Sequence, residues 1–152
     1  MDQDTLDQLK TLHTRAIDAR NGYQEALDEA EGHGCSALFH DMIAVHESHA
    51  RALAAELTKG GETPDDSGSF MSLVHEAIMN VRALFNSLDE SVLPGLIDGE
   101  KRNVEKYDDA LRAINSPPLT PLLTSQRDEL QQRIAKMEAQ QAEFEHAASA
   151  GH

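Results

Sequence analysis

The fold is decided by residues 93–114, LPGLIDGEKRNVEKYDDALRAI. At about 3.6 residues per turn this stretch predicts a helix with one apolar face. That face consists of Leu93, Ile97, Glu100, Val104, Tyr107, Leu111 and Ile114. Glu100 is its single carboxylate and lies within about 20° of its centre. Because an unpaired buried charge is too costly, this carboxylate needs a cation, a metal ion or a proton.

The same periodicity predicts four more helices in the chain. They cover approximately residues 4–31, 35–58, 70–86 and 120–147. The last of them has a narrow apolar seam formed by Leu123, Leu130, Ile134, Met137 and Phe144. Thr120 is expected to cap this helix, with Pro121 at its first position. Residues 59–69, KGGETPDDSGS, predict a loop, and residues 147–152 predict a flexible tail.

Length and charge narrow the class of protein. The chain has 152 residues, which fits a single domain over residues 1–152 with its own core. Its formal net charge of −14 argues against binding to nucleic acid or to anionic membranes, since both need clustered Lys and Arg. No apolar run approaches the ~20 residues of a membrane span. The single cysteine, Cys35, is compatible with the reducing cytoplasm, where we expect the protein.

The lengths of the predicted helices indicate how they are connected. Four of them are long, roughly 35–40 Å at 1.5 Å per residue. The helix over 70–86, together with the preceding loop, is long enough to carry the chain from one end of a bundle to the other. The helices over 35–58 and 93–114 would then run parallel. We therefore predict an all-α, ferritin-like up-down four-helix bundle with a long crossover that contains an extra helix.

Several short motifs resemble those of a known family. They are Gly61-Glu62-Thr63-Pro64, Gly68-Ser69, His75, and Gly99-Glu100 with Tyr107. Together they are similar to the signature of a bacterial ferritin-like family of uncharacterised proteins. The similarity begins in the first helix, at Asn21-Gly22-Tyr23, and extends to the last helix. The resemblance implies a ferritin-like four-helix core and no established enzyme activity.

Counting residues from the predicted helix starts places a polar layer at the middle of the bundle. The predicted layer consists of Arg20, Glu100, Asn103, Tyr107 and Arg133, with His46 and His49 at the same depth. In one interpretation, an arginine supplies the cation that Glu100 needs, since a guanidinium can form two parallel hydrogen bonds to a carboxylate. A polar layer satisfied in this way can fix the alignment of the helices.

The alternative interpretation is a metal site. His46 and His49 are three residues apart, so they share a helix face, and Glu100 would add a carboxylate. Two imidazoles and one carboxylate suit a single Fe, Mn or Zn ion. A dinuclear centre is disfavoured, because it needs inward carboxylates from several helices and Glu25 and Glu47 project away from their apolar faces.

Two functions follow from these interpretations. We predict a non-catalytic helical bundle without a cofactor, a structural or stress-associated binding module whose physiological role the residues do not reveal. The alternative is a mononuclear metal-binding protein that uses His46, His49 and Glu100. We also expect a homodimer, because the helix over 4–31 and the helix that begins near residue 93 carry apolar residues off their main seams. These residues are Leu12, Ala19, Ala26, Val92 and Ala110.

Overall fold

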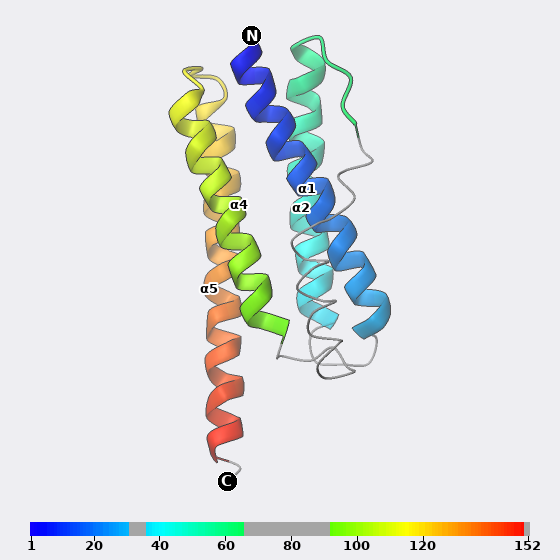
Figure 1. Ribbon diagram of the computed structural model, residues 1–152, viewed down its shortest axis with the longest axis vertical. Coiled ribbons are helices and arrows are strands. Elements are labelled where there is room, and N and C mark those ends of the chain that lie inside the picture. The colour runs from blue at the N-terminus through cyan, green and yellow to red at the C-terminus, as the bar shows by residue number, and fades with distance from the viewer. Residues whose placement is uncertain (31–35, 66–91, 151–152) are drawn as a thin grey trace.

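The computed structural model describes residues 1–30, 36–65 and 92–150 (Figure 1). These residues form four helices and no strand: α1 (Gln3–Ala30), α2 (Ser36–Lys59), α4 (Leu93–Ala113) and α5 (Thr120–Ala150). The all-α prediction is confirmed. The helix predicted over 70–86, and with it the crossover, lies outside the described residues. No stretch of the described helices combines the length and the apolar character that a membrane crossing needs.

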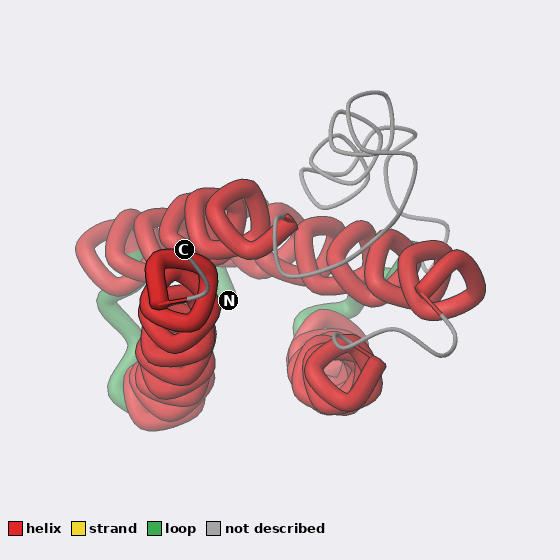
Figure 2. Tube along the Cα trace, turned by 90° about the horizontal axis from the view of Figure 1, so that it is seen from below, coloured by secondary structure: helices red, strands yellow, loops and turns green. Residues whose placement is uncertain are grey.

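The four helices pack as two hairpins. α1 packs mainly on α2, and α4 packs mainly on α5. The hairpins meet through α1 and α4 more than through α2 and α5, as Figure 2 shows from below. α2 and α4 run in the same direction along the bundle, as the sequence predicts (Figure 1). The centre of the α4 face therefore lies in the middle of the bundle, where side chains from the other helices can reach it.

The ends of the helices have identifiable causes. The Asp2 carboxylate accepts a hydrogen bond from the Thr5 amide at 2.7 Å and caps α1. α2 ends at Lys59, and the chain turns at Gly61, whose φ of 86° is the left-handed conformation that a glycine adopts without strain. At α5 the expected cap is wrong. Thr120 is the first helical residue, and its hydroxyl donates to the carbonyl of Ser116 at 3.2 Å.

The predicted apolar seams form the core. Leu93, Ile97, Val104, Tyr107 and Ile114 are all buried, and Leu111 packs against them. In α5 the seam is buried as predicted as far as Met137. Phe144, the last member of that predicted seam, is 39% exposed. The prediction for Phe144 is wrong because α5 has 31 residues and α4 only 21, so α5 extends past its hairpin partner.

The side chains predicted to form the homodimer interface do not lie on the surface of the chain. Every side chain proposed for that interface is buried inside the single chain. Their exposed fractions are 2% for Leu12, 3% for Ala19, and 0% for Ala26, Val92 and Ala110. These residues are therefore part of the core of the single chain. The homodimer itself stays a prediction, but these residues cannot be its interface.

Two adjacent leucines in α5 test the packing of this core. Leu123 is fully buried, whereas Leu122 is half-buried. We expect Leu123→Ala to lower the free energy of unfolding by about 2–5 kcal/mol, because it removes buried methyl groups and leaves a cavity. Leu122→Ala is the matched control and should cost clearly less. Urea denaturation measures both, and equal losses would contradict the core described here.

Candidate functional site

Glu100 lies at the centre of the bundle and is completely buried. Its Oε2 accepts a hydrogen bond from Nε2 of His46 at 2.7 Å, and its Oε1 lies 3.1 Å from the same nitrogen. Nδ2 of Asn103 donates to Oε1 at 2.5 Å. The hydroxyl of Tyr23 lies 3.5 Å from Oε2, at the outer limit of a hydrogen bond. Side chains of α1, α2 and α4 thus satisfy both carboxylate oxygens.

The side chain that compensates Glu100 is the imidazole of His46. Burial raises the pKa of Glu100, but the charge of His46 and the hydrogen bonds from His46 and Asn103 outweigh burial and hold this pKa below its ordinary value. His46 is 2% exposed and lies on the buried face of α2, together with the apolar residues of that helix. The two side chains form a buried acid–imidazole pair between α2 and α4.

Asn103 connects the buried carboxylate to a more accessible arginine. Its Nδ2 faces Glu100, while its Oδ1 accepts a hydrogen bond from Nε of Arg15 at 2.8 Å. The two bonds fix the orientation of the amide, because only the nitrogen donates and only the oxygen accepts. Arg15 of α1 therefore acts on Glu100 through Asn103.

A second acid–imidazole pair lies one turn further along α2. Nε2 of His49 is 2.9 Å from Oε1 of Glu129, which α5 contributes. Gln126 donates to the backbone carbonyl of His49 at 3.4 Å and accepts a hydrogen bond from the hydroxyl of Tyr107 at 2.7 Å. Nδ1 of His49 is buried and has no hydrogen-bond partner among the described residues. These contacts extend the polar layer across all four described helices.

The rings of this layer form a continuous row. Tyr23 stacks on His46 with the ring centroids 5.9 Å apart and the planes 19° apart. His46 meets His49 edge-on at 6.2 Å, and His49 meets Tyr107 in the same way at 6.3 Å. Each imidazole is therefore held by a ring on each side as well as by a carboxylate.

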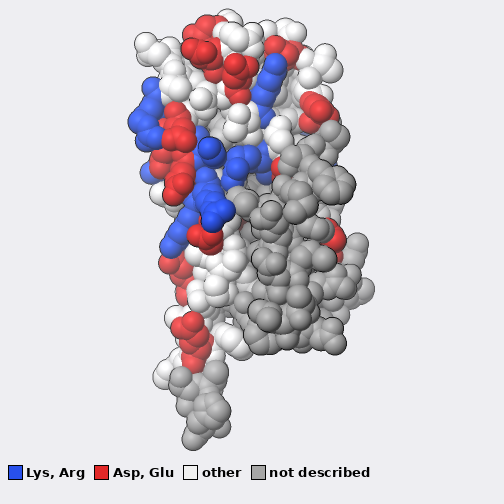
Figure 3. All heavy atoms as spheres, viewed as in Figure 1, with Lys and Arg blue, Asp and Glu red and all other residues white. Residues whose placement is uncertain are grey.

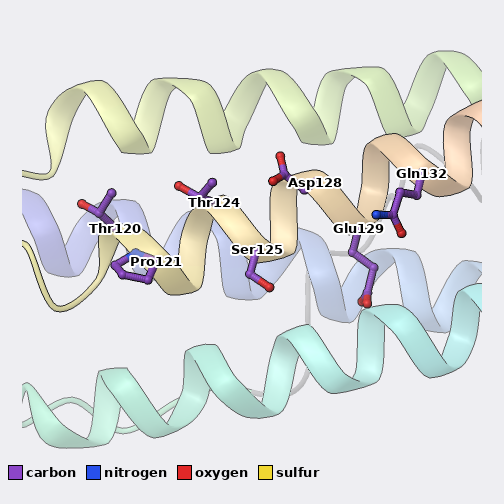
Figure 4. Close-up of a pocket in the computed structure, with 7 residues that line it drawn as sticks. All are labelled: Thr120, Pro121, Thr124, Ser125, Asp128, Glu129 and Gln132. Carbon is purple, nitrogen blue, oxygen red and sulfur yellow. The ribbon is translucent and has the colours of Figure 1, made fainter.

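Solvent approaches the layer at its α5 edge. Glu129 is 42% exposed at its side chain and lines an open hollow with Thr120, Pro121, Thr124, Ser125, Asp128 and Gln132 (Figure 4). The Glu129 side chain points toward α2 in Figure 4, whereas the other residues of the hollow follow one face of α5. Glu129 thus links the surface to His49. Glu100 has no contact with this hollow.

The arginines predicted to pair with Glu100 lie elsewhere. Arg20 donates to the side chain of Asn21 at 3.1 Å. Arg133 forms an ion pair with Asp41 at 2.6 Å, nearer the start of α2. The expected arginine pairing of Glu100 is therefore wrong: Arg20 points to the surface, and Arg133 lies further along α5 than the layer does. Asn103 and Tyr107 are in the layer as predicted.

The three predicted metal ligands come together but do not surround one point. Nε2 of His46 faces Glu100, whereas Nε2 of His49 faces Glu129. Glu25 is exposed, and Glu47 forms a surface ion pair with Arg51. Within residues 1–30, 36–65 and 92–150, no group of three or more His, Cys, Asp or Glu is arranged to hold a metal ion. The donor set therefore does not fit a mononuclear or a dinuclear centre.

Sequence reasoning missed four members of the layer: Tyr23, Arg15, Gln126 and Glu129. Tyr23 lies on the apolar face of the first helix, although a buried hydroxyl usually needs a partner and this need could have pointed to Glu100. Glu129 and Gln126 lie beside the seam of α5, and their side chains reach inward from there. No signal in the sequence distinguishes Arg15 from the other cations of α1, Lys10 and Arg20.

The described residues define an all-α fold of four helices with a buried, hydrogen-bonded polar layer. Its residues 4–113 match the family model described as Domain of unknown function (DUF2383). Since this match covers well over half of the chain, the protein belongs to the DUF2383 family. Comparisons with curated proteins and with solved structures each found no significant match.

His49 makes the stability of the layer depend on pH. Burial lowers the pKa of His49 from 6.5 to about 4, and the charge of His46 adds to this effect, although Glu129 and Glu100 oppose it. The unfolded chain therefore takes up a proton at this residue at a higher pH than the folded chain does. The stabilisation is complete above pH 6.5 and is lost as the pH falls toward 4.

Comparison with His49→Gln isolates this contribution from that of the carboxylates. Between pH 6.5 and 4 we expect the free energy of unfolding of the wild type to fall more steeply than that of His49→Gln. The difference in slope should approach, but not exceed, about 1.4 kcal/mol per pH unit, which is the limit for one proton. Urea denaturation at each pH measures it. Parallel profiles would show that His49 titrates normally in the folded protein.

Proposed function

We propose that this protein is a non-catalytic, ferritin-like helical bundle whose polar layer fixes the alignment of its helices. The observation that carries the proposal is the full satisfaction of Glu100 by His46, Asn103 and Tyr23. A carboxylate that is completely buried and already bonded at both oxygens has no position left for a substrate. Its energetic effect is then on the fold.

The layer suits this role because its bonds connect different helices. His46–Glu100 connects α2 to α4, and Tyr107–Gln126 connects α4 to α5. Sliding any helix by one turn would leave these buried groups without partners, at a cost of about 1–3 kcal/mol for each neutral group and more for each charge. Apolar seams alone tolerate such shifts better, because one leucine can replace another. The polar layer thus selects a single alignment.

The ferritin-like assignment is supported by the parallel directions of α2 and α4, each of which is paired with an antiparallel neighbour. The proposal involves no metal ion, since the donor set of the layer does not fit one. The cytoplasmic location and the stress-associated role stay predictions from the sequence.

A double-mutant cycle on the buried acid–imidazole pair tests the structural role. Glu100→Leu and His46→Leu should each lower the free energy of unfolding by about 3–5 kcal/mol, because each leaves a buried charge or donor without its partner. The double variant should lose about 1–3 kcal/mol less than the sum of the two. Chemical denaturation gives all four values.

The surface ion pair Lys101–Glu138 provides the matched control. Its N–O distance is 3.6 Å and both side chains are more than half exposed, so alanine variants of this pair should show a coupling below about 1 kcal/mol. Equal coupling in the two pairs would contradict the proposal.

Metal titration completes the test. We measure the melting temperatures of the wild type and of the His46→Leu/Glu100→Leu variant with and without Fe(II), Mn(II) or Zn(II). We expect the difference between the two proteins to be no larger with metal than without it. Stoichiometric binding that disappears in this double variant would favour the metal-binding alternative instead.

A further inference from the structure

The C-terminal end of α5 extends beyond the other described helices (Figure 1). α5 has 31 residues, ten more than α4. Met137 is fully buried, but every side chain from Ala142 to Ala147 is exposed. Figure 1 shows this end of α5 projecting past the ends of α1, α2 and α4. A helical end of this kind is only marginally stable in water without a packing partner.

One face of the projecting end has a composition that suits a partner. A hollow follows this face, and we call the residues that line it the overhang face: Lys136, Ala139, Gln140, Glu143, Phe144 and Ala147. Their spacing of three and four residues places them on one side of the helix. Phe144, together with Met1, is one of the two large apolar side chains that are exposed among the described residues. Covering Phe144 would remove apolar surface from water.

We propose that the overhang face pairs with the same face of a second copy of the chain, with the two α5 helices antiparallel. A two-fold axis brings the same residues of both copies together. Lys136 and Glu143 lie at equal distances from the midpoint between Ala139 and Gln140. With the axis at this midpoint, each Lys136 lies opposite a Glu143 of the other copy, and the small side chain of Ala139 permits close approach.

Charge favours this arrangement over others. The chain carries a net charge of −14, so two copies repel each other unless opposite charges meet. Lys136 is the only Lys or Arg between residues 136 and 147, and Figure 3 shows acidic side chains along the projecting end. A parallel pairing would place Lys136 against Lys136 and Glu143 against Glu143. Of the two pairings, only the antiparallel one places a Lys136 opposite each Glu143.

Sedimentation velocity between about 1 and 200 µM tests the proposal, since weak dimers dissociate in the micromolar range. The wild type should pass from the 16.7 kDa chain to a species of twice that mass. Lys136→Glu and Glu143→Lys should each raise the dissociation constant at least tenfold, because each places like charges opposite one another twice per dimer. The variant with both substitutions should return to within about threefold of the wild type.

Mixing the two single variants provides the sharpest test. Lys136→Glu carries only carboxylates at these two positions and Glu143→Lys only ammonium groups, so each should be monomeric alone and the mixture should form a heterodimer. Glu145→Lys is the matched control, because it makes the same charge change beside the overhang face but not on it. It should leave the dimer intact. Circular dichroism of each variant verifies that the fold is unchanged.

Three results would overturn the proposal. A wild type that stays monomeric at every concentration excludes the interface. A dimer that both single charge reversals leave unchanged must use another surface. A dimer that Glu145→Lys weakens as much as Glu143→Lys does would depend on overall charge and not on this pairing. None of these outcomes depends on the role of the buried polar layer.

Discussion

The burial of one carboxylate constrains the rest of this structure. Glu100 is at the centre of the apolar face of α4, where it cannot be solvated, and three helices supply groups to it. α2 provides the charge through His46, α1 provides Tyr23, and α4 itself provides Asn103. If this carboxylate were left unpaired, the penalty would be comparable with the whole stability of a small domain. The positions of the helices around α4 are therefore tied to this one group.

The partner of Glu100 is an imidazole and not a guanidinium. His46 lies between two other rings, Tyr23 and His49. Arginine has a long, flexible side chain, and both candidate arginines reach partners outside the layer, Arg20 on Asn21 and Arg133 on Asp41. The difference matters chemically, because an imidazole exchanges its proton within the ordinary pH range and a guanidinium does not. The buried His49 consequently makes the layer sensitive to acid.

The helices were predictable from the sequence because the spacing of the apolar residues shows which side of each helix is buried. The same count gave the depth of the layer along α2 and α4, so that His46, His49, Glu100, Asn103 and Tyr107 do lie near one another. It could not give the rotation of each helix about its own axis to within one residue, and this rotation decides whether a side chain such as Arg20 points inward. It also could not show that Glu129 reaches inward from the edge of α5 or that Phe144 extends beyond α4. Both depend on the relative lengths and positions of two helices.

The buried layer and the projecting helix end each contain a side chain whose polarity does not match its surroundings. Inside the bundle, a polar residue on an apolar face forces neighbouring helices to provide partners, and every partner found for Glu100 lies within the chain. At the end of α5 the mismatch is reversed, because Phe144 continues an apolar seam into a region where no described helix lies alongside it. The first mismatch is resolved by folding, since the required groups are available in the same chain. The described helices do not cover Phe144, and a second copy of the chain would supply the missing packing partner.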